Sequence, residues 1–376
     1  MSSAAWRRKA VTSFVGWRTA LDARVALGAP PSMAPTAAHV AAPTSAPAAR
    51  GGARGFAQDA AHVARQRRAT LSAGPIVAST EGRRCVATAL ATGGRAADVA
   101  DHALARQYAA EGAVVLRQAV SLDWVEYLRQ ASAEAVATPG PMAEQYARPP
   151  GFYFSDLELA ERLEPFRRFA VQGPCAALAG ELMGASEVCF FYDQYFHQRF
   201  SEAEASQAPA TTPWHQDQPY WSVDGSQVCS VWVPLDPVPL ESAISFIAGS
   251  HRWGLFAPRH FATGQAYGGT GLAHLPSLGG ERRLAWATEP GDVIVFSGMT
   301  VHGQEDAKRV RGEFRRLSLR FTGDDARFCR REGEAADVVP SRHHPCSLQP
   351  GDPMPCARFP TVWRRSAGGP DAAAAA

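Results

Sequence analysis

The segment Thr211–Trp221, TTPWHQDQPYW, places a histidine and an aspartate two residues apart among aromatic residues and prolines. An unpaired charge in so apolar a segment is costly, so Asp217 needs a positive partner. In a β-strand, residues i and i+2 face the same side, and we therefore expect His215 and Asp217 to point together while Gln216 points away. The pattern predicts two ligands that converge on one cation.

A third candidate ligand is His302, at the end of the strand-like run EPGDVIVFSGMTVHG and 87 positions after His215. Two histidines and one carboxylate form the facial triad that binds Fe(II) in non-haem oxygenases and leaves coordination positions open. The alternative is a chance HxD pair without a metal, because such short patterns recur in many proteins. The separation leaves room for several strands to bring His302 back to His215.

Downstream, the run FRRLSLRF places Arg316, Ser318 and Arg320 on one face of an expected strand. A guanidinium with a hydroxyl two residues later could bind one carboxylate together, because arginine binds carboxylates in a bidentate way. The neighbouring Arg315 is the alternative for this role if a β-bulge shifts the alternation.

The secondary structure that would position these residues is expected to change from helices to strands along the chain. Helical spacing and a glycine stop predict a helix over 97–111, followed by a strand over 113–120 and a helix after Ser121, which is placed to cap it. A second helical region is predicted from about 156 to 183. Helices first and strands afterwards indicate an α+β domain built on a β-sandwich or barrel. The expected strands lie within EVCFFYDQYFHQRF, QVCSVWVPLD, ESAISFIAGS, GDVIVFSGM and RRLSLRFTG.

The composition excludes several classes of protein. No window approaches eighteen consecutive apolar residues, so we expect no membrane span. Seven scattered cysteines without a CxxC pair argue against a disulfide framework or a zinc knuckle and favour a reducing compartment. Beyond residue 80 the chain carries 28 basic and 34 acidic residues, which gives no electrostatic reason to expect a nucleic acid partner.

The N-terminal segment differs from the rest in composition. Residues 1–95 are rich in Ala, Arg, Ser, Pro and Gly without an apolar period, and we predict that they are disordered. Ten basic residues against two acidic ones before residue 80 are typical of a transit peptide for a mitochondrion or a plastid. The alternative is a low-complexity tail without a targeting role on a cytoplasmic protein. We expect an ordered domain over 97–331 and an irregular tail over 332–376.

From about Tyr108 to Asp325 the chain resembles the phytanoyl-CoA dioxygenase family of Fe(II)/2-oxoglutarate oxygenases. The resemblance is carried by the motifs FFYDQYF, TPWHQDQPYW, VCSVWVPLDPV, AGSHRWG, PGDVIVFSGMTVHG and RRLSLRF, in family order. It implies a double-stranded β-helix, or jelly-roll, core with the N-terminal helices packed on it. It also implies iron held by His215, Asp217 and His302, with 2-oxoglutarate and O₂ as cosubstrates.

The resemblance further implies that an arginine on the strand after His302 holds the far carboxylate of 2-oxoglutarate, and side-chain alternation favours Arg316 over Arg315. Trp232 resembles a pocket-wall tryptophan of the family. The chain departs from the family at Gln198, where relatives often have a lysine, and at Gln304, where they often have a serine. The affinity for the cosubstrate, or its identity, therefore stays open.

In related halogenases a small residue replaces the aspartate, so the retained Asp217 favours a hydroxylase. We expect a small-molecule substrate, lipid-like or a secondary metabolite, which the sequence does not identify, and the oligomeric state also stays open. Tyr220 and Trp221 follow the expected metal strand and belong either to the core or to the substrate entrance. The alternatives are a non-catalytic jelly-roll protein that binds a metal or ligand, and a cupin-like dioxygenase that needs no arginine for 2-oxoglutarate.

Overall fold

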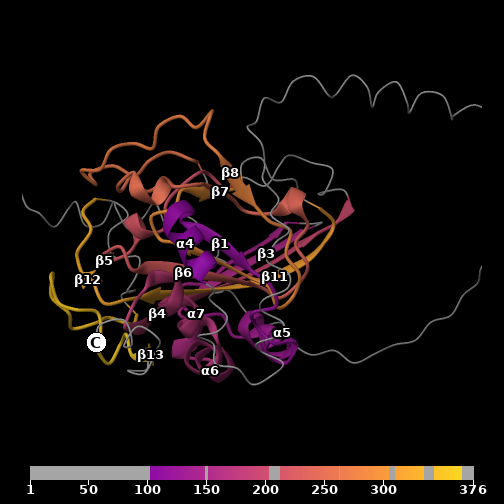
Figure 1. Ribbon diagram of the computed structural model, residues 1–376. Helices are drawn as coiled ribbons and strands as arrows, with labels where there is room; N and C mark the ends of the chain where they lie inside the picture. Colours follow the sequence, from indigo (N-terminus) through magenta and orange to yellow (C-terminus); the bar gives the residue numbers. More distant parts are fainter. Residues whose placement is uncertain are drawn as a thin grey trace, which may run out of the picture. The chain divides into compact units, whose positions relative to one another are not determined.

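The computed structural model describes residues 102–148, 151–202, 212–261, 263–304, 310–333 and 343–365. The predictions of disorder and targeting for residues 1–95 lie outside these described residues. Within them the chain forms four α-helices and three antiparallel sheets (Figure 1). The helices are α4 (His102–Glu111), α5 (Leu122–Ala137), α6 (Glu164–Gln172) and α7 (Cys175–Met183), and the 3-10 helices are η4 (Leu159–Glu161), η5 (Gln218–Tyr220), η6 (Leu240–Ser242) and η7 (Ser250–Arg252).

The largest sheet has eight strands, and two smaller sheets complete the fold. The order in the large sheet is β1 (Ala113–Leu116), β9 (Val293–Ser297), β6 (Val228–Pro234), β11 (Gly312–Thr322), β4 (Glu187–Phe200), β3 (Gly151–Leu157) and β2 (Glu144–Arg148), with β13 (Thr361–Arg364) paired to β4. The three-stranded sheet has the order β10 (His302–Gly303), β7 (Ser245–Ile247) and β8 (Arg283–Ala285), and β12 (Arg327–Phe328) pairs with β5 (Val223–Asp224).

The end of α4 and both ends of α5 lie where the sequence predicts, while the predicted start of the first helix at residue 97 lies outside the described residues. The Ser121 hydroxyl accepts a hydrogen bond from the Trp124 amide at the start of α5, which is an N-cap. The helix α4 stops at Gly112, which has φ +80°, a conformation that glycine adopts without a steric penalty. A side chain at this position would also collide with the ring of His251. The glycine therefore turns the chain directly from α4 into β1.

Two other predictions are wrong in detail. The second helical region does not begin at Asp156, because that residue lies in β3, which forms a hairpin with β2, and α6 begins only at Glu164. The tail is not irregular throughout, because β13 extends the large sheet and Phe359 is fully buried. The pairing of β13 with β4 joins residues that are far apart in the sequence, which local patterns do not reveal.

The large sheet separates two hydrophobic layers. On one face it packs against the helices, of which α5, α6 and α7 lie beneath β4 and β11 in Figure 1. On the other face, residues of β1 and β9 pack with Phe246 of β7 and Leu284 of β8, so the small sheet lies across from the large one. This is the arrangement of a jelly roll, with the interior between its two sheets.

Strand β11 shows how the sequence divides these two layers. Leu317 and Leu319 are buried in the hydrophobic cluster that includes the helices. Arg316, Ser318 and Arg320 alternate with them and therefore point to the other side, into the interior of the jelly roll. The strand contains an irregularity in its pairing with β4, but it lies between Arg320 and Phe321, beyond these three residues. The polar face of β11 is the floor of the site described below.

None of the helices in the described part of the chain is long and apolar enough to cross a membrane. Every cysteine among those same residues is free, as the absence of a cysteine framework in the sequence suggests.

Candidate metal centre and cosubstrate site

The two candidate histidine ligands face each other across a short β-bridge. The amide of His215 donates to the carbonyl of His302, and the amide of His302 donates to the carbonyl of His215, each at 2.9 Å. The predicted strand before His302 is β9, which ends at Ser297, and His302 is the first residue of a separate short strand, β10, and not part of a turn. The reciprocal pair of bonds sets the two rings side by side, with centroids 4.3 Å apart.

Asp217 reaches the histidines through a turn and not through strand alternation. Its backbone is helical, with φ −75° and ψ −43°, and it immediately precedes η5. The expectation that His215 and Asp217 share a strand face is therefore wrong, although the two side chains do converge. Gln216 points away as expected, and its amide bonds the carbonyls of Gly254 and Met299.

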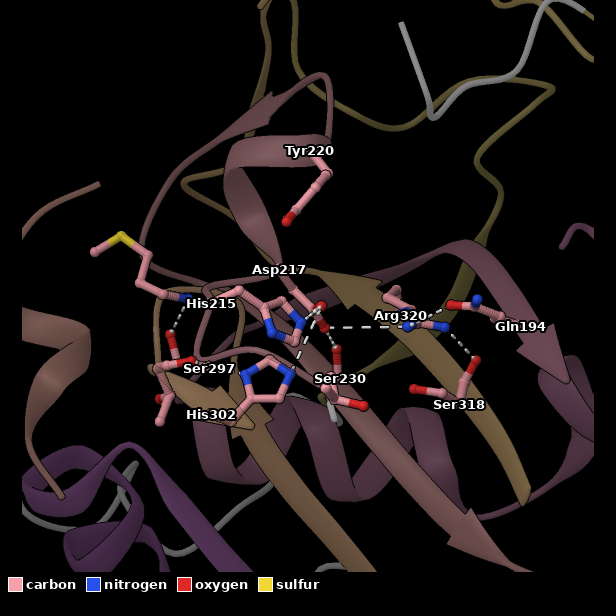
Figure 2. A network of polar contacts seen from close by, with 12 residues as sticks. Gln194, His215, Asp217, Tyr220, Ser230, Ser297, His302, Ser318 and Arg320 are labelled. Carbon is pink, nitrogen blue, oxygen red and sulfur yellow. Dashed lines mark hydrogen bonds and ion pairs between the residues drawn. The ribbon is translucent and has the colours of Figure 1, made fainter. Parts of the chain in front are cut away.

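The three side chains form one cluster in the interior of the jelly roll (Figure 2). The Oδ1 atom of Asp217 lies 3.6 Å from Nε2 of His215 and 3.8 Å from Nε2 of His302. One ligand atom from each residue lies within 4.8 Å of the other two. Two imidazole nitrogens and one carboxylate oxygen at these distances fit a single divalent ion such as Fe(II), with positions left for other ligands.

Main-chain carbonyls select which ring nitrogen of each histidine faces the cluster. Nδ1 of His215 lies 2.8 Å from the carbonyl of Pro213, and Nδ1 of His302 lies 2.9 Å from the carbonyl of Thr300. A carbonyl only accepts, so each Nδ1 carries the proton and each Nε2 keeps a lone pair for a metal. Burial, with the neighbouring His215, lowers the pKa of His302 to about 4, which keeps its ring neutral.

The second oxygen of Asp217 is fixed from the opposite side. The hydroxyl of Ser230, on β6, donates to Oδ2 at 3.0 Å, and Nη2 of Arg320 lies 4.0 Å from the same atom (Figure 2). Burial alone would raise the pKa of Asp217, but His302, His215 and Arg320 outweigh it and hold the pKa below its usual range. The carboxylate is thus charged and oriented with Oδ1 towards the histidines.

Arg320 is itself held by four groups. Its guanidinium donates to the carbonyl of Ser318 and to the side chain of Gln194, each at 3.0 Å, and it lies over the rings of Tyr192 and Trp221. The sequence places Arg320 on the face of Arg316 but gives it no role, and it gives none to Ser230. The regular spacing of Arg316, Ser318 and Arg320 is the signal that could have identified Arg320.

Arg316 lies on the same face of β11, four residues before Arg320. Its side chain is 5% exposed, and Nη1 donates to Oε1 of Gln198 at 2.6 Å. Burial lowers its pKa to about 10, so the group stays charged at neutral pH. Among the described residues no carboxylate forms an ion pair with Arg316. A buried cation of this kind is suited to an anionic ligand.

Two further residues predicted for the cosubstrate lie beside Arg316. The hydroxyl of Ser318 is buried and has no hydrogen-bond partner within the described residues. Trp232 is half-buried, pairs with Ser318 in the β6–β11 register, and packs on the ring of Phe196 at 5.4 Å. An orphaned hydroxyl two residues from a buried guanidinium fits a bound carboxylate, as expected for 2-oxoglutarate.

Arg315 and Gln304 turn away from this interior. Arg315, with a side chain 22% exposed, forms a bidentate ion pair with Asp236, at 2.9 Å from Nε and 2.8 Å from Nη2. Gln304 donates its side-chain amide to the carbonyl of Ser242 at 3.0 Å. Of the two candidate arginines, therefore, only Arg316 is directed into the jelly roll.

The two aromatic residues after Asp217 differ in position. Trp221 is fully buried and packs on Phe191 and Tyr192, so it belongs to the core, which is one of the two predicted alternatives. Tyr220 lies beside the metal centre instead, with its ring 6.1 Å from that of His215. Its ring also stacks on Phe261 at 5.5 Å. A role at the substrate entrance stays a prediction for Tyr220.

Comparison with solved structures gives the same fold. The chain matches the non-haem α-ketoglutarate dependent epimerase SnoN from nogalamycin biosynthesis with a TM-score of 0.52 and 20% identity, over 69% of this chain and 98% of SnoN. SnoN in complex with Fe³⁺, α-ketoglutarate and nogalamycin RO matches with a TM-score of 0.53 and 22% identity, over 69% and 98%. The carbocyclase SnoK matches with a TM-score of 0.53 and 19% identity, over 71% and 98%.

Comparison with curated proteins gives no significant match. The family model described as phytanoyl-CoA dioxygenase (PhyH) matches residues 108–317, which is more than half of the chain and contains the triad. The jelly-roll fold, the triad of His215, Asp217 and His302, and the match agree with iron and 2-oxoglutarate as the cofactors. The chain belongs to the phytanoyl-CoA dioxygenase family of Fe(II)/2-oxoglutarate-dependent oxygenases.

Proposed function

We propose that this oxygenase hydroxylates a small organic molecule, lipid-like or a secondary metabolite. The observation that carries the proposal is the convergence of an intact triad with the buried Arg316 on the same interior face of the jelly roll. Bound iron and 2-oxoglutarate supply the oxidising chemistry for a substrate C–H bond. The residues of the chain bind and orient these groups and exclude water from them.

In this proposal the two ends of the site have separate tasks. His215, Asp217 and His302 hold the metal, and the hydroxyl of Ser230 keeps Asp217 in one orientation. Arg316 and Ser318 hold the far carboxylate of 2-oxoglutarate. Gln198 orients the guanidinium of Arg316 by accepting a hydrogen bond from its Nη1. The carboxylate thereby gains charge-assisted hydrogen bonds in a place with little water.

Asp217 is the main support for hydroxylation among the reactions known for such enzymes. A small residue in its place would free a metal position for a halide, and this chain keeps the carboxylate. The structural neighbours SnoN and SnoK are described as an epimerase and a carbocyclase, so the same fold also supports reactions that add no oxygen. The mass of the product separates these outcomes.

The test is an untargeted comparison of metabolites after incubation with the purified protein, Fe(II), 2-oxoglutarate and ¹⁸O₂. Hydroxylation gives succinate and a product that carries one ¹⁸O atom. A product of unchanged mass indicates epimerisation, and a loss of two hydrogens indicates ring closure or desaturation. Either of these products without ¹⁸O would refute the hydroxylase proposal while keeping the oxygenase family.

The alternative is a non-catalytic jelly-roll protein that binds a metal or ligand. The intact triad and the buried Arg316 favour an enzyme, because a binding protein needs neither the full set of ligands nor the distal cation. Iron-dependent formation of succinate separates the two. Binding of Fe(II) and 2-oxoglutarate without any succinate, with every metabolite fraction tested, would favour the non-catalytic alternative.

We also propose that Met1–Thr80 directs the protein to a mitochondrion or a plastid. The support is compositional: ten basic residues against two acidic ones. A fluorescent reporter fused after this segment should enter one of these organelles. A reporter that stays diffuse in the cytosol would leave only the low-complexity tail on a cytoplasmic protein.

A further inference from the structure

A surface-exposed aromatic ring lies directly against one of the metal ligands. Phe261, in the loop between β7 and β8, is 49% exposed, and its ring is perpendicular to that of His215, with the centroids 4.8 Å apart. His215 itself is buried. Phe261 belongs to none of the hydrophobic core clusters that the described residues form. Core packing therefore does not explain why this ring lies at the metal centre.

Phe261 and Tyr220 form a stacked pair beside the metal centre. Their rings are nearly parallel, with the centroids 5.5 Å apart. The ring of Tyr220 lies 6.1 Å from that of His215 and perpendicular to it, and Figure 2 shows Tyr220 above His215 and Asp217. Among the described residues no aromatic ring other than those of Tyr220 and His215 packs on Phe261. One face of Phe261 is thus covered by Tyr220, and its exposed surface is left for a ligand.

Hydrogen bonds hold both rings of the pair in position. The hydroxyl of Tyr220 donates to the carbonyl of Arg259 and accepts from the amide of the same residue, each at 2.6 Å. Burial raises the pKa of Tyr220, so this hydroxyl stays protonated at neutral pH. The amide of His260 donates to the carbonyl of Gln265 at 2.8 Å, which closes a turn that contains Phe261. Contacts within the protein therefore set the pair in place, as in a preformed ligand site.

The loop that carries Phe261 is also tied to the segment that carries the metal ligands. Gln216 lies between His215 and Asp217, and its side-chain amide donates to the carbonyl of Gly254 at 2.8 Å. Its Oε1 accepts from the amide of Phe256 at 2.9 Å. These bonds and those of Tyr220 fix the loop to the metal segment at two points. A molecule that packs on Phe261 is therefore held beside the ring of a metal ligand.

The chemistry of this surface favours a flat ring as the ligand. The exposed part of Phe261 offers an apolar area that any hydrocarbon group can cover. An aromatic ring gains further stabilisation there, because offset stacks and edge-to-face contacts between rings are worth more than the area that they bury. The contacts of Phe261 with Tyr220 and with His215 are already of these two kinds. A flat ring of a ligand extends the same set of contacts.

We propose that Phe261 binds a flat apolar ring of the substrate and so determines which part of the molecule lies next to the metal. This inference rests on the proposed function, because it identifies the chemical class of that substrate: an organic molecule with an aromatic or other planar unsaturated ring. Phe261 is in this proposal a specificity-determining residue. The triad and Arg316 keep the tasks described above.

The test uses NMR spectra of two small probes with the full chain saturated with Mn(II) and 2-oxoglutarate. The probes are 1-naphthol, which is flat and aromatic, and decahydro-1-naphthol, which has the same carbon skeleton and hydroxyl but no flat ring. Paramagnetic Mn(II) broadens the proton signals of a molecule that binds close to it, whereas diamagnetic Zn(II) does not. We expect Mn(II)-dependent broadening of 1-naphthol and roughly five-fold weaker binding of the saturated probe, as the loss of one aromatic contact predicts.

Substitutions of Phe261 test its role in this binding. Phe261→Ala should weaken binding of 1-naphthol about ten-fold, as the loss of apolar area and of a ring contact predicts. Phe261→Tyr keeps a ring and should retain binding. The matched control is Leu122→Ala, which removes an exposed apolar side chain from α5 and should leave binding unchanged.

Electron paramagnetic resonance of Mn(II) checks that each variant still holds the metal. The proposal is overturned by equal binding of the two probes, by no broadening of 1-naphthol, or by unchanged binding in Phe261→Ala. Loss of Mn(II) from Phe261→Ala would also overturn it, because the ring would then act as a support for His215. Succinate formation and the mass of the product, measured separately, test the proposed function, so the two failures are distinguishable.

Discussion

The metal end and the cosubstrate end of the site are built in different ways. The metal ligands come from a short bridge and a turn, and main-chain carbonyls or Ser230 bond the atoms of the ligands that do not face the cluster. The residues proposed to bind the cosubstrate come from the long regular strands β4, β6 and β11, and within the described residues the buried Arg316 has one hydrogen bond and the hydroxyl of Ser318 has none.

This difference is consistent with two different ligands, a metal ion at one end and, as proposed, 2-oxoglutarate at the other. At the metal end the protein satisfies its own polar atoms, so the geometry of the ligands is set before a metal binds. At the proposed cosubstrate end a buried charge and a buried hydroxyl are left for a ligand, and the strands set the direction of both side chains. Substitutions at one end should therefore change metal affinity, and substitutions at the other should change the Michaelis constant for 2-oxoglutarate.

The largest effect is expected from loss of a metal ligand. His215→Ala and His302→Ala should abolish Fe(II) binding and succinate formation, because two remaining ligands do not complete the triad. Asp217→Ala should also stop hydroxylation, since it removes the anionic ligand. Anaerobic calorimetry with Fe(II) measures the affinity, and circular dichroism checks that the variants are folded. Tight retention of iron by both histidine variants would refute the triad.

The next effect separates the two consecutive arginines. Arg316→Ala should raise the Michaelis constant for 2-oxoglutarate ten- to a hundred-fold, which corresponds to about 1.5–3 kcal/mol for a charge-assisted contact. The affinity for Fe(II) should not change. Steady-state kinetics at saturating Fe(II) measures the first effect, and calorimetry measures the second.

Arg315→Ala is the matched control, because it removes the same charge from the adjacent position. It should leave the Michaelis constant near that of the wild type and lower the free energy of unfolding, since Asp236 loses its main partner. If Arg315→Ala raises the Michaelis constant and Arg316→Ala does not, the role of cosubstrate anchor passes to Arg315.

A smaller effect is expected at the oxygen of Asp217 that faces away from the histidines. Ser230→Ala removes the donor to Oδ2, and loss of such a supporting bond should weaken Fe(II) binding about ten-fold. The Michaelis constant for 2-oxoglutarate, measured at saturating iron, should stay the same. A change in that constant without a change in iron affinity would show that Ser230 acts at the other end of the site.

The smallest effect is expected at Ser318. Ser318→Ala should raise the Michaelis constant for 2-oxoglutarate a few-fold, but it should not lower the free energy of unfolding. A buried hydroxyl without a partner costs about 1–3 kcal/mol, so its removal loses no stabilising bond within the protein. Urea unfolding without 2-oxoglutarate measures the stability. A clear loss of stability would mean that the hydroxyl has a partner within the fold.

The sequence predicted which side chains come together more accurately than it predicted the strands and turns that hold them. The HxD pair and the distant His302 come together as expected, and alternation along β11 correctly directs Arg316 inward and Arg315 outward. Alternation succeeds there because β11 pairs with a strand on each side over these residues. It fails at Asp217, because proline and a 3-10 turn follow it and the chain leaves the strand conformation.

What the sequence could not show depends on contacts between distant residues. Ser230 acts only because β6 brings its hydroxyl to Asp217, and a serine in a strand has no local mark of that role. The strand β13 and the burial of Phe359 likewise arise from pairing with β4, far away in the chain. Local sequence patterns identify residues of the types that bind metals. The hydrogen bonds that support those residues can be identified only once the fold is known.

The reciprocal backbone bonds between His215 and His302 also bear on the choice of metal. They fix the two backbones, and the bonds from Nδ1 to the carbonyls of Pro213 and Thr300 fix the two rings, so contacts within the protein orient both nitrogen ligands. Such a site offers little discrimination of its own, and Ni²⁺, Cu²⁺ and Zn²⁺ generally bind nitrogen and oxygen ligands more tightly than Fe²⁺. The metal that the purified protein carries should therefore depend on which divalent ions are available to it as well as on the geometry of the ligands.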